Sequence, residues 1–250
     1  MPTWAEAGLW GLLGGGALVI GALIAWFVRV PAAVVAGVMA FGSGVLISAV
    51  AFDLMAEAAR TGGLGATALG FLGGAVVYLA ANAALARRGA QHRKRSGGQQ
   101  PSEEQQAGSG AAIAVGALLD GIPESVVLGV GLLGGGSVSL SVLAAVFISN
   151  VPEGLSSAAG MKRSGRSAAY VFGVWTTIAV ISAIAAFVGY AALGGAPPEL
   201  IAVITAVAAG AILTMIADTM IPEAFEETRT WTGLITTVGF LVAFAIDQAG

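Results

Sequence analysis

Five acidic residues lie inside long apolar stretches of this sequence: Asp53, Asp120, Glu124, Glu153 and Asp218. A charged side chain near the centre of a bilayer costs at least about 2.5–3.5 kcal/mol, so acids inside apolar helices are rare and usually functional. Every Lys and Arg lies in a polar connection or at the end of an apolar run. The pattern therefore predicts that these carboxylates have no basic partner, and that a proton or a cation from solution supplies the missing positive charge.

Two apolar stretches carry a proline directly before a glutamate, in Asp120-Gly-Ile-Pro-Glu124 and Ser149-Asn-Val-Pro-Glu153. Asp120 and Glu124 are four residues apart, which places both carboxyl groups on one helical face. A proline inside a helix also frees the carbonyl group four residues earlier, and transporters build ion sites from such broken helices. The alternative is that both prolines are packing kinks and both acids are protonated hydrogen-bond donors.

The composition indicates which elements position these residues. Hydrophobic residues make up 57% of the chain and charged residues 10%, where a soluble domain carries roughly 25% charged residues. A helix needs about 20 apolar residues to cross a bilayer. Eight runs of this kind lie near 6–28, 32–59, 63–86, 109–133, 138–161, 168–193, 199–221 and 231–248. The sequence thus predicts an all-α integral membrane protein with eight transmembrane helices.

One long polar segment, residues 87–110, divides the apolar runs. The predicted organisation is transmembrane helices 1–3 over 1–86, a flexible cytoplasmic loop over 87–110, helices 4 and 5 with the site over 111–161, and helices 6–8 over 162–250. His92, the single histidine, is interpreted as a solvated residue of this loop.

Basic residues predict the orientation, because they stay on the cytoplasmic side of short connections. With the N-terminus outside, ten Lys and Arg residues fall inside and only Arg60 falls outside. The ten are Arg29, Arg87, Arg88, Arg93, Lys94, Arg95, Lys162, Arg163, Arg166 and Arg229. We therefore expect a multi-pass protein of the plasma membrane with both termini extracytoplasmic.

The ends of the second and seventh apolar runs resemble each other. When Gly44 is superposed on Gly210, Glu57 also coincides with Glu223. The predicted topology takes these two runs across the membrane in opposite directions, so the similarity indicates an inverted repeat, a hallmark of secondary transporters. Chance similarity between two Gly- and Ala-rich helices is the alternative.

Acids mark a route through the predicted bundle. Asp53 and Glu57 approach the outer surface and Asp218 and Glu223 the inner one, with Glu124 and Glu153 between them. The first four are expected to line a transport pathway. For Glu57 and Glu223, simple solvation at the membrane interface is the alternative interpretation.

The eight helices, the polar loop after the third and the two Pro-Glu sequences resemble the ZIP (Zrt/Irt-like) family of divalent metal transporters. The most specific part is Asn150-Val-Pro-Glu-Gly-Leu155, and the whole resembles a divergent, bacterial-type member. The resemblance implies a 3+2+3 helix arrangement with inverted repeats and a possible homodimer. It also implies a metal site on Asp120, Glu124, Ser149 and Glu153, with Asn150 and Gly121 at a second metal position.

The chain departs from the family pattern at several of these positions. Asp120 and Gly121 stand where the family has His and Asn, the sixth run has no acid, and the loop is not rich in histidine. One oxygen-rich site remains, which favours iron(II), manganese or cobalt relative to zinc, because carboxylate and hydroxyl oxygens suit harder ions.

The expected function is transport of a divalent transition metal (zinc, iron(II) or manganese) into the cytoplasm, with the metal as substrate and no permanent cofactor. The expected partners are the metal ion and the lipid bilayer, without nucleic acid. An enzyme is not expected, because no span offers a histidine, a cysteine or a Gly-x-Ser-x-Gly turn. The alternatives are a proton-coupled carrier of another solute and a non-transporting metal-binding membrane protein.

Overall fold

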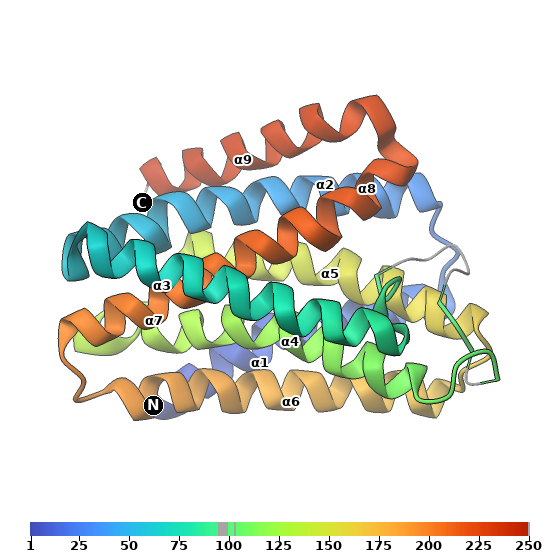
Figure 1. Cartoon of the computed structure of the whole chain (residues 1–250), viewed down its shortest axis with the longest axis horizontal. Helices are drawn as coiled ribbons and strands as arrows, with labels where there is room; N and C mark the ends of the chain where they lie inside the picture. Colours follow the sequence, from blue (N-terminus) through green and yellow to red (C-terminus); the bar gives the residue numbers. More distant parts are fainter. Residues whose placement is uncertain (95–99, 103, 250) are drawn as a thin grey trace.

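A computed structural model describes residues 1–94, 100–102 and 104–249, and the regular structure in this part of the chain is all helical (Figure 1). The α-helices are α1 (Thr3–Phe27), α2 (Ala32–Ser48), α3 (Ala56–Leu85), α4 (Ser109–Val130), α5 (Leu140–Arg163), α6 (Ala168–Leu193), α7 (Pro198–Met215), α8 (Ile221–Thr228) and α9 (Thr232–Ala249). Within the described residues, six helical segments are long and apolar enough to cross a membrane. The prediction of an all-helical fold is confirmed, and these apolar helices fit a membrane protein.

Two of these six segments are much longer than a bilayer crossing requires. They run from Ala32 to Ala90 and from Pro198 to Gln248, roughly 90 Å and 75 Å if straight, against about 30 Å of hydrocarbon. Each contains a residue with non-helical backbone angles: Gly63 (φ 75°, ψ 162°) and Arg229 (φ 45°, ψ −118°). Figure 1 shows the ribbon reversing after α2 and again between α8 and α9. The six segments therefore include two that the sequence analysis divides into separate spans.

Two short π-helices continue α2 and α7. They cover Ala49–Met55 and Ile216–Met220, and each contains one of the acids that the sequence analysis singles out, Asp53 and Asp218. π-Helical turns are rare and occur frequently at functional sites. They fall in the two stretches of sequence that resemble each other.

Two helix pairs pack through glycines contributed by both partners. In the α2–α9 pair, a Cβ on Gly44 would overlap the Thr236 carbonyl oxygen and one on Gly239 would overlap that of Phe41. The α3–α7 pair repeats this pattern with Gly210 against Phe71 and Gly74 against Val207. In all four places the missing side chain lets two helix backbones touch, as small residues do in membrane helix pairs.

Gly210→Ala is expected to destabilise the fold by about 1–3 kcal/mol, the usual effect of overpacking. The new methyl group would meet backbone atoms of Phe71, so α3 and α7 must separate. Gly37→Ala in α2 is the matched control, because its methyl group would meet no atom within 4 Å. Thermal unfolding in detergent compares the two variants, and equal melting temperatures would contradict this account of the packing.

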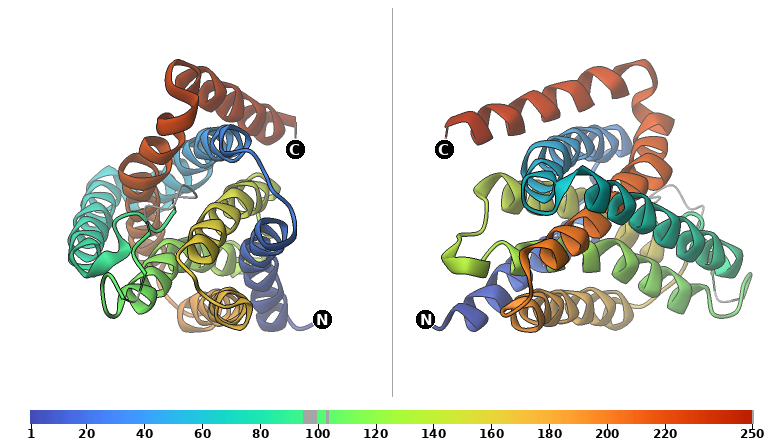
Figure 2. Two further views of the ribbon diagram at one scale, coloured as in Figure 1. Left: turned by 90° about the vertical axis from the view of Figure 1, so that its right-hand side faces the viewer. Right: turned by 60° about the vertical axis from the view of Figure 1, so that its left-hand side comes forward.

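Helices α4 and α5, which carry the two Pro-Glu sequences, lie inside the bundle. α4 packs mainly against α6, α1 and α7, and α5 packs mainly against α1 and α2. Figure 2 shows α5 enclosed between these neighbours. The acids of α4 and α5 are therefore held in the protein interior.

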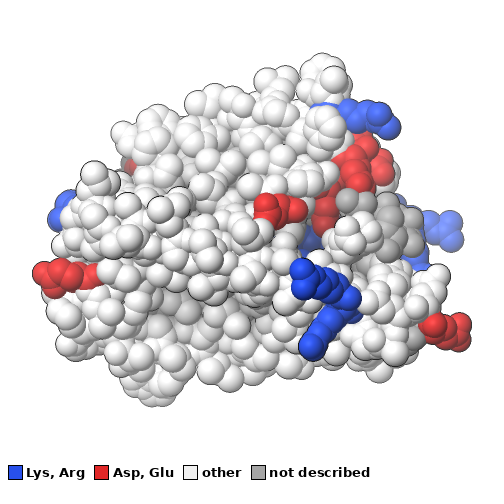
Figure 3. Space-filling model, in the orientation of Figure 1, with Lys and Arg blue, Asp and Glu red and all other residues white. Residues whose placement is uncertain are grey.

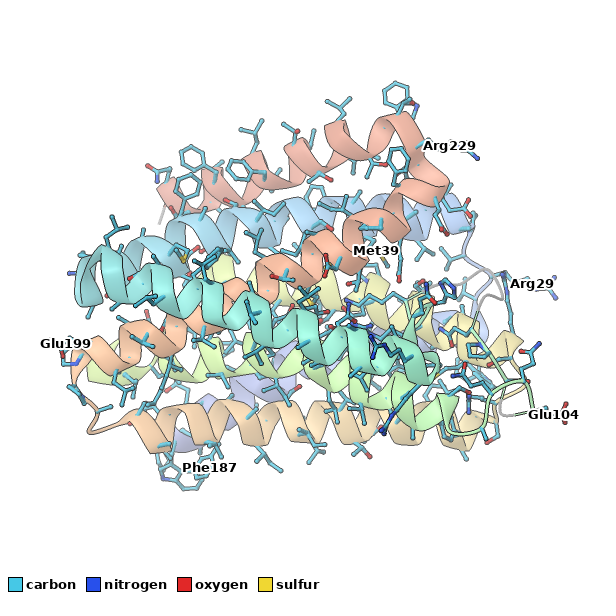
Figure 4. All side chains as sticks on the ribbon, viewed as in Figure 1. Arg29, Met39, Glu104, Phe187, Glu199 and Arg229 are labelled. Carbon is cyan, nitrogen blue, oxygen red and sulfur yellow. The ribbon has the colours of Figure 1, made fainter. Side chains whose placement is uncertain are left out.

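Charged side chains gather at one end of the molecule. Figure 3 shows most exposed Lys and Arg atoms of this face toward the right-hand end. Figure 4 labels Arg29, Glu104 and Arg229 at that end and Glu199 at the other, and both termini lie toward the Glu199 end in Figure 1. The grouping agrees with the predicted distribution of basic residues. Assignment of that end to the cytoplasm, and of the protein to the plasma membrane, stays a prediction.

Candidate functional site

The site is built on the two central helices. Asp120, Glu124 and Glu153 are buried, with exposed fractions of 2%, 2% and 3%. α4 and α5 continue through their prolines without interruption, so the expected breaks at the Pro-Glu sequences are absent. Because α4 is regular over this stretch, Asp120 and Glu124 lie on one face of it, as their spacing predicts.

Two basic side chains reach these acids, and the prediction that the carboxylates have no basic partner is wrong for Asp120 and Glu153. Arg93 donates from Nη2 to Oδ1 of Asp120 at 2.9 Å and from Nε to Oδ2 at 3.1 Å. Lys94 Nζ lies 2.8 Å from Oε2 of Glu153 and 3.2 Å from Oδ2 of Asp120. Both basic side chains are almost fully buried, with 3% of Arg93 and 1% of Lys94 exposed. The prediction failed because residues that are distant in sequence and polar in their local context fold back into the bundle.

Polar groups of α3 complete the surroundings of Asp120. The Tyr78 hydroxyl donates to Oδ1 of Asp120 at 2.6 Å and accepts from Nη2 of Arg93 at 3.0 Å. Asn82 accepts from Nη1 of Arg93 at 2.8 Å. Sequence reasoning missed both residues. Their signal was a tyrosine and an asparagine four apart in an otherwise apolar run, the same one-face spacing that drew attention to Asp120 and Glu124.

The backbone around Arg93 and Lys94 is fixed by further hydrogen bonds. Ser156 on α5 donates its hydroxyl proton to the Lys94 carbonyl oxygen. Gln100 donates to the carbonyl oxygens of Arg93 at 2.8 Å and Ser157 at 3.1 Å. This part of the polar segment is therefore packed against the bundle, and the expectation of solvation is wrong for Arg93, Lys94 and Gln100. Flexibility of the segment stays a prediction. His92 is half-buried. Residues 95–99 and 103, including Arg95, lie outside the described residues.

The five charged groups do not balance. Asp120, Glu124 and Glu153 can carry three negative charges, and Arg93 and Lys94 carry two positive ones. Burial alone would lower the pKa of Lys94, but the carboxylates of Asp120 and Glu153 raise it above its usual value, which keeps the ammonium group charged. Neither carboxylate oxygen of Glu124 has a hydrogen-bond partner in the described part of the chain. Among the described residues, Glu124 is thus the acid of the three that forms no ion pair with Arg93 or Lys94.

Ser149 and Asn150 are buried beside this cluster, and each donates a hydrogen bond to a backbone carbonyl group. The Ser149 hydroxyl donates to the Val146 carbonyl oxygen at 3.0 Å, and the Asn150 amide donates to that of Gly14 on α1 at 3.0 Å. Gly121 faces Ser182 on α6.

The described residues contain no group of three or more His, Asp or Glu side chains close enough to hold one metal ion together. Lys94 bridges Asp120 and Glu153 instead. The ligand set of Asp120, Glu124, Ser149, Asn150 and Glu153 therefore stays a prediction.

A cavity of about 670 Å³ opens at the end of the bundle where Figure 4 labels Glu199. Asp53 and Glu57 both line it. Oδ1 of Asp53 accepts from the hydroxyl groups of Ser139 at 2.7 Å and Ser141 at 2.9 Å. Glu57 is exposed and pairs with Arg60 at 2.7 Å. The two acids expected at the outer surface therefore share one water-accessible space.

The inner part of this cavity is apolar. Val127, Leu128 and Val142 line it, and Leu128 follows Glu124 by four residues on α4. About 6 Å, slightly more than one helical turn, therefore separates Leu128 from Glu124 along the helix axis. Along α4, Val127 and Leu128 lie between Glu124 and the rest of the cavity lining.

The two acids expected at the inner surface lie outside both the buried cluster and the cavity. Asp218 is exposed on the π-helix after α7, and Glu223 is half-buried on α8. Neither lines the cavity. Their part in a transport pathway stays a prediction.

No protein-family model and no curated protein matches this chain. The resemblance to the ZIP family accordingly rests on the Pro-Glu sequences and the pattern of apolar runs.

Proposed function

We propose that this protein carries a divalent metal cation across the membrane through a site formed by Asp120, Glu124 and Glu153. The observation that supports this most directly is the carboxylate of Glu124, which is buried in the bundle and lacks a hydrogen-bond partner among the described residues. A buried unpaired charge is strongly unfavourable and is tolerated where function requires it. The substrate cation provides the missing charge.

Oxygen ligands define the class of cation. The three acids, with the hydroxyl of Ser149 and the amide of Asn150 nearby on α5, offer oxygen atoms, and the chain has no cysteine. Carboxylate oxygens bind manganese and iron(II) readily, whereas zinc more often uses imidazole or thiolate ligands. We therefore place manganese and iron(II) ahead of zinc as substrates.

Barriers on both sides of the acids support a carrier rather than an open pore. On one side, Val127 and Leu128 lie on α4 between Glu124 and the rest of the cavity lining. On the other, Arg93 and Lys94 cover Asp120 and Glu153. A carrier opens one barrier at a time, so closure on both sides is what alternating access requires of an intermediate state.

The paired packing supports eight crossings in a 3+2+3 arrangement with an inverted repeat. In this proposal α1, α2 and α3 correspond to α6, α7 and α9. The symmetry of the repeat then relates the α2–α9 contact to the α3–α7 contact. In each contact, both helices contribute a glycine. The two π-helices also occupy corresponding places after α2 and α7.

Uptake by proteoliposomes tests the proposal. Liposomes loaded with a metal-sensitive dye and containing the purified protein are expected to take up Mn²⁺, Fe²⁺ or Zn²⁺ faster than protein-free liposomes, with a rate that saturates as the metal concentration rises. A second set, loaded with a pH-sensitive dye, detects proton movement. Proton movement without entry of any of these metals would overturn the proposal in favour of a proton-coupled carrier of another solute.

A further inference from the structure

Lys94 occupies the place between two acids that a bound cation would need. Its Nζ atom lies 2.8 Å from an oxygen of Glu153 and 3.2 Å from an oxygen of Asp120, so one positive charge bridges carboxylates from α5 and α4. Arg93 adds a second charge on Asp120. Together the two residues contribute two positive charges, the same charge as one divalent metal ion.

The protein is shaped to receive these two side chains. Gly116 on α4 leaves room for Arg93, since a Cβ there would lie 2.6 Å from its Cδ atom. The acceptors on Asn82 and Tyr78 match the guanidinium group. Ser156 binds the Lys94 carbonyl oxygen on the other side. The contacts come from three helices, which distinguishes this arrangement from a surface ion pair.

We infer that Arg93 and Lys94, here called the basic pair, are a built-in competitor for the transported cation. The basic pair holds the carboxylates while no metal is bound, and the metal and Lys94 exclude each other from the space between Asp120 and Glu153. The inference rests on the proposed function. It goes beyond that function because the polar segment would control how tightly the site binds metal and whether the site is closed.

Electrostatics favours replacement of the basic pair by a divalent ion over withdrawal of the basic pair alone. Withdrawal alone would leave three buried acids without a counter-charge, and removing one side of a buried ion pair is strongly unfavourable. Arrival of a divalent ion replaces both positive charges in one step, so the net charge of the interior stays constant. The empty site is therefore kept closed on the side of the polar segment.

The chain contains a pivot next to the basic pair. α3 continues into a short π-helix over Ala86–Ala90, where Gly89 has φ 99°, a conformation that residues with a side chain rarely adopt. Gly89 therefore marks the place where the regular helix gives way to the turn that carries Arg93 and Lys94. A change of backbone angles there would move the basic pair without moving the rest of α3.

Metal binding to the purified protein tests the competition. Lys94→Met is expected to bind Mn²⁺ at least about tenfold more tightly than the wild type, because a competitor lowers the apparent affinity by the fraction of sites that it occupies. Arg88→Met is the matched control: Arg88 is an exposed basic residue of the same segment, and its loss is expected to leave the affinity unchanged. Equal affinities of Lys94→Met and the wild type would overturn the inference.

Thermal unfolding distinguishes a change in metal affinity from a general loss of stability in the variant. Lys94→Met loses two ion pairs and is expected to melt below the wild type without metal. Added Mn²⁺ is then expected to raise its melting temperature more than that of the wild type, since the ion replaces the missing charge. A variant that melts lower and gains no more from Mn²⁺ than the wild type would overturn the inference.

Thiol labelling reports the movement itself, in a chain whose natural sequence lacks cysteine. Ser156→Cys places a thiol under the Lys94 backbone, where it is buried. Its reaction with a maleimide is expected to be at least about tenfold faster with Mn²⁺ than without it. The labelling rate of a buried thiol follows the fraction of molecules in which the polar segment has moved away and exposed it. Ser164→Cys, at the end of α5, is expected to react equally in both conditions. Unchanged labelling of Ser156→Cys under saturating Mn²⁺ would overturn the inference.

The outcomes separate the two proposals. If the wild type binds and transports metal while Lys94→Met keeps the wild-type affinity, the competitor role fails and the transport function stands. If neither protein binds or transports Mn²⁺, Fe²⁺ or Zn²⁺, the proposed function fails, and the inference that rests on it fails as well.

Discussion

Glu124→Gln is expected to reduce metal uptake to the level of protein-free liposomes while leaving the protein folded. The other two acids of the cluster have basic partners, but neither oxygen of Glu124 has a hydrogen-bond partner in the described structure. Replacing this carboxylate by an amide therefore breaks no ion pair. It removes the one carboxyl group of the cluster that has no basic partner among the described residues and is therefore available to a substrate cation.

The size of the effect follows from the ligand chemistry. A neutral amide is a much poorer ligand for a hard divalent ion than a carboxylate. A loss of at least about tenfold in the initial uptake rate, equivalent to about 1.4 kcal/mol, is the smallest effect consistent with direct binding. Initial rates are measured in dye-loaded liposomes that contain equal amounts of each protein.

Glu199→Gln is the matched control for this experiment. Glu199 is exposed at the far end of the bundle, at the start of α7 (Figure 4). Its substitution removes the same charge from the chain without touching the buried cluster, and wild-type uptake is expected. If Glu124→Gln transports at more than half the wild-type rate, Glu124 does not bind the substrate.

Sequence reasoning placed the central helices well. The apolar runs predicted near 109–133, 138–161 and 168–193 correspond to α4, α5 and α6, which cover Ser109–Val130, Leu140–Arg163 and Ala168–Leu193. Such runs are recognisable because a bilayer sets a minimum length for an apolar helix. The burial of Asp120, Glu124 and Glu153 was predictable for the same reason, since acids in the middle of such runs have no route to water.

The partners of those acids could not be predicted in this way. Arg93 and Lys94 lie in a polar segment, and the local pattern of such a segment indicates solvation. Their burial depends on contacts with Asp120 and Glu153, which are 27 and 59 residues away in the chain. Periodicity reports on a helix and its own faces, whereas an ion pair between distant segments leaves no periodic signal.

Asp53 and Glu57, the two acids near the end of the second apolar run, differ in burial and in hydrogen-bond partners. Asp53 is half-buried and binds two serine hydroxyls, while Glu57 is exposed and pairs with Arg60 three residues later. The alternative interpretation of Glu57 as a solvated interfacial residue agrees with its exposure. Hydropathy alone does not separate two acids one turn apart.

Asp120→Asn is expected to destabilise the protein by about 3–5 kcal/mol, the usual result of removing one partner of a buried ion pair. The substitution leaves the guanidinium group of Arg93 buried opposite a neutral amide and removes one of the two carboxylates that contact Lys94. The free energy of unfolding, measured by denaturant titration in detergent, reports the change.

A surface pair in the same chain provides the comparison. Glu57 and Arg60 form an ion pair of similar length, 2.7 Å, but their side chains are 55% and 75% exposed. Glu57→Gln is therefore expected to change the free energy of unfolding by about 0–1 kcal/mol. If Asp120→Asn costs no more than Glu57→Gln, the Arg93–Asp120 contact does not hold the polar segment in place.

The double variant Arg93→Met/Asp120→Leu tests why Asp120→Asn destabilises the protein. The cause is either the unpaired charge of Arg93 or the loss of the contacts that Asp120 makes with Tyr78 and Lys94. Replacing both partners of a buried ion pair by apolar residues is often neutral or stabilising, so this variant is expected to recover most of the stability that Asp120→Asn loses. Full recovery would mean that the ion pair is not required for folding. The chain would then keep two opposite charges in its interior for the handling of a third charge, the substrate cation. A double variant as unstable as Asp120→Asn would instead show that Asp120 stabilises the bundle through Tyr78 and Lys94, independently of Arg93.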